Sequence, residues 1–249
     1  MNLYALGVPT SVVIDDYLVA SGSTVFSNPG KDKSLWGPFY EKIMAKFHGN
    51  FHHIDGGFAE NAVRNIINAP ELMYRVHNSM SIDDLWDALK RHDLAHNIIQ
   101  AGSPQGDDSI TSAAGIVQGH NYVVLGVIEL STGDRLVRLR NPWGSETYIA
   151  DWSDESDKWT SDLRDEAGAT QADDGIIFMS IEDYHEEFSE TAVNKNMDGV
   201  HQDYFLMLDD DGSKASDEAP IEPGNTVHKL TITSSVEQNV IVTANVWEA

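Results

Sequence analysis

The sequence predicts an α+β fold in which helices come first and a β-rich part follows. Helical spacing of apolar residues is the main pattern up to about residue 96, and short strand-like runs separated by turn residues come after it. Such segregation of helices and strands along a chain is typical of α+β proteins. The 249 residues are 41% hydrophobic, which is enough to bury the core of one large domain or two smaller ones.

The N-terminal part is expected to begin with a strand and to continue with helices. The β-branched run 11–20 predicts a buried strand. Apolar residues at helical spacing predict a helix over 34–47, with Ser34 as its N-cap. A Gly-Gly turn and a short helix should follow before Pro70. The segment 81–92 opens with a cap-like serine and acidic residues and closes with basic ones, which predicts another helix.

The second part contains four strand-like runs and one short helix. The strands are predicted at 96–102, 120–130, 135–141 and 175–181, and the helix at 180–188. The turn "STGD" at 131–134 favours a hairpin between the second and third strands. The acidic segment 208–225, which carries Gly and Pro, indicates a loop or linker. Alternation in the last residues, 227–249, predicts two or three further strands.

Charge and cysteine content exclude several kinds of function. The net charge is −24, from 40 acidic and 16 basic residues, which argues against a nucleic-acid partner and allows cations or basic protein surfaces. The chain has no cysteine, so it can supply no disulfide, thiolate zinc site or cysteine nucleophile. No apolar run approaches the ~18 residues of a membrane helix, so no membrane insertion is expected.

A histidine and an asparagine suggest the remains of a catalytic site. His120 precedes an apolar strand, and Asn141 ends the next one. In a Cys–His–Asn mechanism the thiolate attacks a carbonyl, the imidazole exchanges a proton, and the amide fixes the ring. Trp143 could cover the bond between ring and amide and keep water away from it. Alone, two such residues 21 positions apart are weak evidence, because a single histidine is more often a surface or core residue.

The surrounding strings are more specific. "GIVQGHNYVVLGV" and "LVRLRNPWGSETYIADWSD" resemble the calpain protease core, the papain-like family C2, around its catalytic His and Asn. "VPTSVVIDDYLV", "LWGPFYEKIMAKFHGNFHHIDGG" and "DDGIIFMSIEDYHEEFS" are similar to further segments of that core, in the family's order, over about residues 8–190. The resemblance implies a papain-like fold with His120 as catalytic histidine, Asn141 as orienting residue, Trp143 as shield and Gly119 as a backbone contact for substrate.

The same resemblance implies a division of the chain. Residues 1–76 would be the remnant of the first protease subdomain, without its cysteine region. Residues 77–195 would form the second subdomain, which carries the His and Asn. Residues 196–249 would be a linker and strands that faintly resemble the start of the β-sandwich domain that follows the calpain core.

The sequence departs from the family at the nucleophile and at a glycine pair. The family's Cys, and the Gln that helps to form its oxyanion hole, lie upstream of the "VVIDD" strand, where this chain begins. Without the thiolate no covalent step is available, and loss of an oxyanion donor alone costs a few kcal/mol of barrier. We therefore predict no peptidase activity for this polypeptide alone. Asn68 and Ala69 stand where calpains have a second Gly-Gly pair, and their Cβ atoms would obstruct a substrate.

Calcium is the one cofactor that the resemblance implies. Asp154 and Asp174 match two of the family's ligand positions, whereas Thr147 and Ile176 stand where carboxylates are expected. Glu146 is adjacent to Thr147, and Asp173 lies three residues before Ile176. Calcium takes six to eight oxygen ligands, so we expect a weak site at most, and a solvated loop is favoured for the acidic run 151–157.

Three functional hypotheses follow. The chain is a non-catalytic, calpain-derived scaffold or subunit of a complex; or it is the His/Asn half of a split protease whose Cys lies on another chain; or it is a fragment of a longer calpain. A protein partner is expected to cover the face of residues 1–76, through the strand at 10–19, because that face would otherwise expose apolar surface. The family's default location is the cytoplasm.

Overall fold

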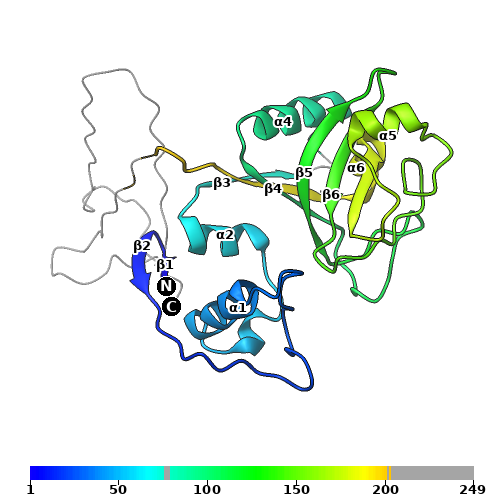
Figure 1. The fold of residues 1–249 in the computed structure, drawn as a ribbon. Helices are drawn as coiled ribbons and strands as arrows, with labels where there is room; N and C mark the ends of the chain where they lie inside the picture. Colours follow the sequence, from blue (N-terminus) through cyan, green and yellow to red (C-terminus); the bar gives the residue numbers. More distant parts are fainter. Residues whose placement is uncertain (76–78, 201, 203–249) are drawn as a thin grey trace, which may run out of the picture. The chain divides into compact units, whose positions relative to one another are not determined.

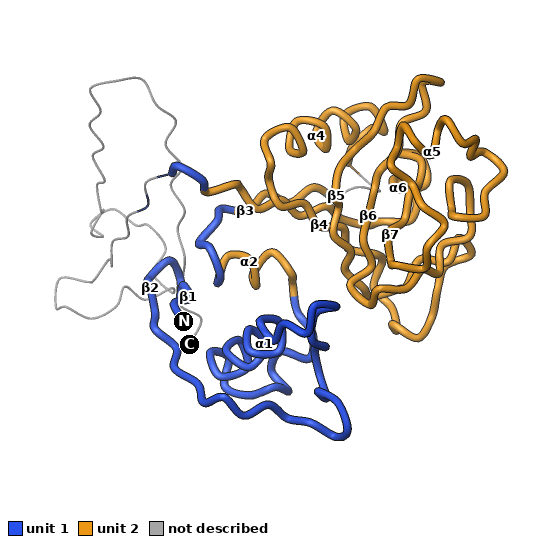
Figure 2. The backbone as a smooth tube through the Cα atoms, viewed as in Figure 1, with its two compact units in different colours: residues 1–57, 65–70, 198–249 blue, residues 58–64, 71–197 orange. Residues whose placement is uncertain are grey.

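The computed structural model describes residues 1–75, 79–200 and 202. Figure 1 shows the helices and strands of the chain, which divides into two compact units (Figure 2). The first comprises residues 1–57, 65–70 and 198–249, and the second comprises residues 58–64 and 71–197. The predicted acidic linker at 208–225 and the predicted strands at 227–249 lie outside the described residues.

The first unit is built from a hairpin and a helix. Its strands β1 (Asn2–Ala5) and β2 (Val8–Ser11) pair antiparallel. Helix α1 (Trp36–Phe47) confirms the helix predicted there, and a 3-10 turn, η1 (Phe51–Ile54), follows it. The small core of the unit joins the hairpin to the helix, through Leu3, Val12 and Ile43.

The buried strand predicted over 11–20 is wrong. Strand β2 ends at Ser11, and the chain beyond it exposes Val13, Tyr17 and Val19. Carbonyls of this segment accept hydrogen bonds from lysines of α1: Lys42 donates to the carbonyl oxygen of Asp15 at 3.2 Å. The β-branched composition favoured extended backbone, but a ladder also needs a neighbouring strand, and here lysine ammonium groups satisfy the carbonyls instead.

Ser34 does not cap α1 either. The N-cap residue is Leu35, which makes no side-chain cap bond. Ser34 belongs to a tight turn before the helix, where its backbone N–H donates to Asp32 Oδ1 at 2.9 Å. The turn competes for the serine in the way that short polar residues commonly do. Helix α2 (Ala59–Ile67) follows the Gly-Gly turn and ends before Pro70, as predicted, and its residues are divided between the two units.

A six-stranded antiparallel sheet dominates the second unit. In spatial order its strands are β3 (Glu71–Arg75), β8 (Glu190–Asn194), β4 (Ile98–Gly102), β5 (Asn121–Glu129), β6 (Arg135–Arg140) and β7 (Ile176–Ser180). The four strands predicted in this part are confirmed, and β3 and β8 are additional. The predicted hairpin turn joins β5 to β6, where Leu130 N donates to the Asp134 carbonyl at 2.9 Å. The mixed α+β class is thereby confirmed.

Three helices accompany the sheet. They are α4 (Ile82–Leu94), α5 (Ser161–Ala167) and α6 (Ile181–Glu187). The predicted cap of α4 is present, because the Ser81 side chain accepts from Asp84 N. Helix α4 contacts β4, β5 and α6, and α6 contacts β6 and β7. Within the part of the chain that the structure describes, no helix is long and apolar enough to cross a membrane.

Strand β6 carries apolar residues on both faces. Val137 and Leu139 join the main core, together with residues of α4 and α6. Leu136 and Phe178 join a second, smaller core that includes Trp152. Side chains alternate along a strand, so this division places the two cores on opposite faces of the sheet. The arrangement buries β6 on both sides and fixes the position of its end, where Asn141 lies.

Candidate functional site

The structure brings His120 and Asn141 together. His120 comes directly before β5 and Asn141 directly after β6, and these two strands pair antiparallel with Val123 opposite Arg140. The Nε2 atom of His120 lies 3.0 Å from Oδ1 of Asn141. Asn141 is fully buried, whereas His120 is half-buried. The proximity expected from the sequence is therefore present, and the catalytic roles remain predictions.

The amide of Asn141 determines which ring nitrogen of His120 carries a proton. Nδ2 of Asn141 donates to the Ser145 carbonyl at 3.1 Å, so the amide oxygen is the atom that faces the histidine. That oxygen also accepts the Trp143 N–H at 3.1 Å. An amide oxygen can only accept, so Nε2 of His120 must donate, and its neutral tautomer keeps Nδ1 as an acceptor. Nδ1 makes no hydrogen bond to any described residue.

Two aromatic rings flank the imidazole. The Trp143 ring lies 4.5 Å from it, centroid to centroid, at an angle of 46°. Tyr122 meets it at 5.0 Å and 87°, and the tyrosine hydroxyl accepts the Val117 N–H at 3.0 Å. Trp143 is 53% exposed and thus covers the site from the solvent side, while Tyr122 is completely buried. Rings in this arrangement keep water from the His–Asn bond and restrict the imidazole.

Ser103, which the sequence reasoning missed, holds the backbone of His120. Its N–H and its hydroxyl both lie 3.0 Å from the His120 carbonyl oxygen. The same hydroxyl oxygen accepts the His120 N–H at 2.9 Å. In a regular antiparallel pair a backbone carbonyl would accept that N–H. The serine hydroxyl therefore extends the β4–β5 ladder by one residue at the point where the chain turns into Pro104.

Gly119 is required by the local backbone. Its φ is +59°, and a Cβ placed there would lie 2.3 Å from the carbonyl oxygen of Gly106. Its own N–H donates to the Pro104 carbonyl at 2.8 Å. A side chain would be both strained and in collision, so this position needs glycine whatever its role toward substrate.

The altered glycine pair lies in the first unit. Asn68 has φ +55°, a conformation that asparagine tolerates better than most residues. Its side chain donates to Gln202 Oε1 at 3.0 Å. Ala69 is completely buried, so its methyl group faces the interior. Any obstruction of a substrate by this pair would therefore come from Asn68.

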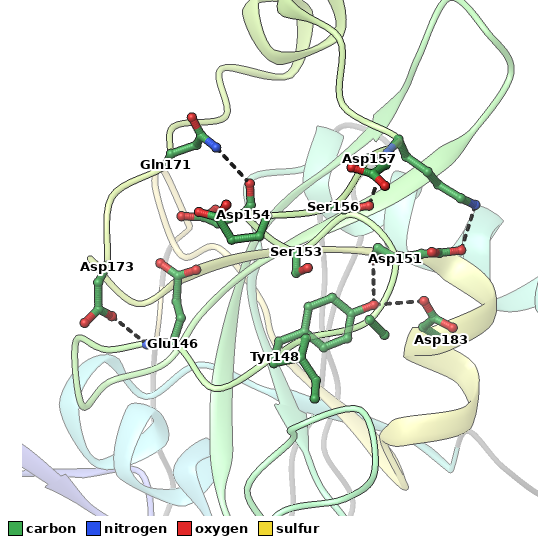
Figure 3. A pocket seen from close by; sticks show the side chains of 14 residues that line it. Glu146, Tyr148, Asp151, Ser153, Asp154, Ser156, Asp157, Gln171, Asp173 and Asp183 are labelled. Carbon is green, nitrogen blue, oxygen red and sulfur yellow. Dashed lines mark hydrogen bonds and ion pairs between the residues drawn. The ribbon is translucent and has the colours of Figure 1, made fainter.

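The residues expected for calcium surround a separate, acidic pocket (Figure 3). Its volume is about 810 Å³. Glu146, Asp154 and Asp173 line it, together with Asp151, Glu155, Asp157 and Asp183 and a single cationic side chain, Lys158. Asp174 is not part of the lining, and its Oδ1 accepts the Ile176 N–H at 3.0 Å. The pocket thus contains one of the two aspartates named from the resemblance.

The donor set does not fit a calcium ion. Within the described residues, no group of three or more acidic or histidine side chains is placed to hold a metal. The Glu146 N–H donates to Asp173 Oδ1 at 2.8 Å, and the Asp174 N–H donates to Glu146 Oε1 at 3.2 Å. These carboxylates are therefore engaged by backbone N–H groups, while calcium needs several of them directed at one point.

Burial and mutual repulsion change the protonation of this pocket. Burial, assisted by repulsion from the carboxylates of Asp154, Asp174 and Asp173, raises the pKa of Glu146 to about 7, although the hydrogen bond from the Asp174 N–H opposes the rise. Burial also raises the pKa of Asp154, which the Arg164 guanidinium partly opposes. The charged forms are thus disfavoured on both carboxyls, as expected of like charges in a partly desolvated site.

Comparison with known proteins gives the class of this fold and site. Residues 1–195 match the family model described as calpain family cysteine protease. The chain belongs to the calpain family of cysteine proteases, and it contains no cysteine.

Particular relatives come from plants and mammals. The chain is similar to the calpain-type cysteine protease DEK1 of Arabidopsis thaliana, with 34% identity over 186 residues. That match covers 71% of this chain and 9% of the relative. Mouse calpain-12 is 31% identical over 201 residues, which are 77% of this chain and 27% of the relative. The chain therefore spans a minor part of the length of the curated relatives that it matches.

Proposed function

We propose that this chain is the His/Asn half of a calpain-type cysteine endopeptidase and is inert by itself. The proposal is supported above all by the tautomer of His120. Nε2 is committed to Asn141 at 3.0 Å, and Nδ1 is left as an acceptor without a partner among the described residues. A base needs such a free nitrogen, and a thiol group is the natural donor to it in this family. The thiol must come from outside these 249 residues, which contain no cysteine.

Each residue then has a definite role. Nδ1 of His120 takes the proton of the incoming thiol and stabilises the thiolate as an ion pair. After attack on the peptide carbonyl, the same nitrogen returns the proton to the leaving amine. Asn141 keeps the ring oriented throughout, because its amide is itself held by Ser145. Trp143 excludes water from that bond.

The arrangement of the protein follows from the same proposal. Residues 1–76 and 77–195 correspond to the two halves of a papain-like core, and residues 196–249 to the linker and the beginning of a following β domain. The first unit exposes large apolar side chains, of which Val13 is 75%, Tyr17 80% and Trp36 73% exposed. These side chains provide a surface for the polypeptide segment that carries the cysteine.

The test is labelling with a thiol-directed peptidyl epoxide. The chain is tagged, isolated from its source with whatever polypeptide accompanies it, and treated with the probe. We expect a labelled cysteine in that assembly. His120→Ala should abolish the labelling, and Asn141→Ala should reduce it about 10-fold or more, because general-base catalysis contributes roughly 100-fold or more. His52→Ala, which changes an exposed histidine, is the matched control and should leave it unchanged.

A non-catalytic scaffold is the second candidate. Two observations favour it: the absence of cysteine and the presence of Asn68, whose side chain occupies the position of a family glycine. An assembly that forms but gives no label with the probe would support the scaffold and contradict the protease half. Labelling that persists in His120→Ala would contradict the roles proposed for His120 as base and for Asn141 as the residue that orients it.

A further inference from the structure

We propose that direct hydrogen bonds tie the loop 146–154 to the loop 171–175, and that Arg164 of α5 anchors the first of these loops, in place of the calcium ion that the resemblance assigns there. The second unit would then hold its His–Asn pair without calcium. This inference concerns the folding of the chain and does not depend on the proposed peptidase role.

The first tie is reciprocal. Glu146 donates its backbone N–H to the Asp173 carboxylate, and its own carboxylate accepts the N–H of Asp174, at 2.8 and 3.2 Å. Two loops that are far apart in sequence thus exchange a pair of hydrogen bonds (Figure 3 shows Glu146 and Asp173 side by side). A bridging cation would have to share these two carboxylates with the N–H groups that they already accept.

The second tie combines a loop-to-loop hydrogen bond with a cation from α5. Nη2 of Arg164 donates to the backbone carbonyl oxygen of Asp154 at 2.6 Å, and Nε2 of Gln171 donates to the same oxygen at 3.3 Å. The guanidinium is also stacked over the Trp159 ring at 5.2 Å. Arg164 therefore supplies a fixed positive charge and takes up a carbonyl oxygen, which are the two things that a calcium ion would do here.

Thr147 and Ile176, which stand where carboxylates are expected, make contacts of their own. Thr147 uses its hydroxyl to bond the Gly115 carbonyl at 2.6 Å. Ile176 packs against the smaller core, which includes Trp152 and Phe178. Both residues contribute to folding through contacts that a carboxylate could not make. The replacement of ligands is thus matched by a local structure that uses the new side chains.

The tied loops reach the candidate site through one hydrogen bond. Asn141 donates its N–H to the carbonyl oxygen of Gly175 at 2.7 Å. Gly175 has φ +81°, and a Cβ there would lie 2.9 Å from the Cα of Gly144. The end of the second loop is therefore packed directly against the turn that carries Asn141 and Trp143. Loosening the loops should loosen the partner of His120.

The test combines thermal unfolding with hydrogen exchange on the full chain. We expect 5 mM calcium to move the unfolding midpoint by no more than magnesium at equal concentration does, since general screening acts on both. A site bound at about 100 times its Kd would instead give a calcium-specific rise of about 5 °C or more, and that result would overturn the proposal.

Variants test the role of Arg164 itself. Arg164→Gln should lower the midpoint by several °C and speed hydrogen exchange at the Asn141 N–H. Arg91→Gln, which changes an exposed arginine on α4, is the matched control. Glu146→Gln keeps an Oε1 acceptor and should retain slow exchange even if Arg164→Gln fails to fold. Equal behaviour of the two arginine variants, or fast exchange in Glu146→Gln, would contradict the proposed ties.

Discussion

Two histidines of the second unit each contact an asparagine side chain, but they differ in how many of their ring nitrogens are hydrogen-bonded. Among the described residues, the His120 side chain is hydrogen-bonded only to Asn141, through Nε2. His92, which is 4% exposed, uses both ring nitrogens: Nε2 lies 2.8 Å from the Tyr74 hydroxyl and Nδ1 lies 2.9 Å from Nδ2 of Asn97. The difference is Nδ1 of His120, which has no hydrogen-bond partner among the described residues. A histidine with both nitrogens occupied is structural, whereas a free nitrogen beside solvent leaves a base available.

The bonds of His92 predict a dependence of stability on pH. The Asn97 oxygen accepts from the Asn196 N–H, so its NH₂ group must donate to Nδ1, which therefore cannot carry a proton without losing that bond. Burial lowers the pKa of His92, and the charges of Arg91 and Lys195 lower it further. Because the unfolded chain takes up the proton first, stability is present above pH ~6.5 and is lost as the pH falls below that value.

We expect the unfolding midpoint of the native chain to fall between pH 7.5 and 5.5 by more than that of His92→Gln. The variant should be less stable at pH 7.5, because it loses one of the two ring bonds. His52→Gln changes an exposed histidine and should follow the native curve. Parallel pH profiles for the native chain and His92→Gln, measured by urea unfolding, would show that His92 does not titrate with folding.

The sequence predicts those residues of the candidate site that stand within a recognisable motif. It does not predict those whose role arises only from the course of the backbone. His120, Asn141 and Trp143 stand in strings with a recognisable order. Ser103 does not, because its value lies in a hydroxyl that replaces a backbone carbonyl at a strand end. A serine followed by proline after a strand is a weak signal for such a role. The loops that carry Glu146 and Asp173 are likewise recognisable in the sequence by their acidic residues. The hydrogen bonds between the two loops depend on the backbone path, so the sequence does not predict them.

At the scale of elements, prediction succeeded where local chemistry decides the structure. Helix α4 carries its cap, its acidic first turn and its basic last turn within its own residues. Strands β3 and β8 lack such signals, since β8 is "ETAVN" and owes its place to pairing with both β3 and β4. The run 11–20 failed for the converse reason, because it had strand composition without a strand beside it. Tertiary pairing decides such segments.

The serines before the two long helices, Ser81 and Ser34, give a matched pair of variants. Ser81→Ala should destabilise the chain by about 1 kcal/mol, because the side chain satisfies the Asp84 N–H at the start of α4. Ser34→Ala should change stability by less than about 0.5 kcal/mol, since Ser34 is only half-buried and caps no helix. Urea unfolding followed by circular dichroism measures both. Equal losses would mean that the assignment of the caps is mistaken.

At the scale of the whole molecule, charge is the dominant feature. The chain carries a net charge of −24, and the acidic pocket concentrates part of it. The ion pairs among the described residues are mostly at the surface, for example Lys90 with Glu129 at 3.2 Å. Exposed pairs of this kind contribute about 0–1 kcal/mol each. Repulsion among the excess carboxylates should therefore outweigh the stabilisation that these pairs provide.

Salt should consequently stabilise this protein. Raising sodium chloride from about 0.02 to 0.5 M shortens the screening length from over 20 Å to under 5 Å, which weakens repulsion over the whole surface. We expect the unfolding midpoint at pH 7.5 to rise by several °C. At pH 4.5 the same addition should have a much smaller effect, because this pH is close to the isoelectric point of about 4.5, where the net charge is near zero. A midpoint that falls with salt at pH 7.5 would instead mean that specific ion pairs, and not the excess negative charge, control the stability of the fold.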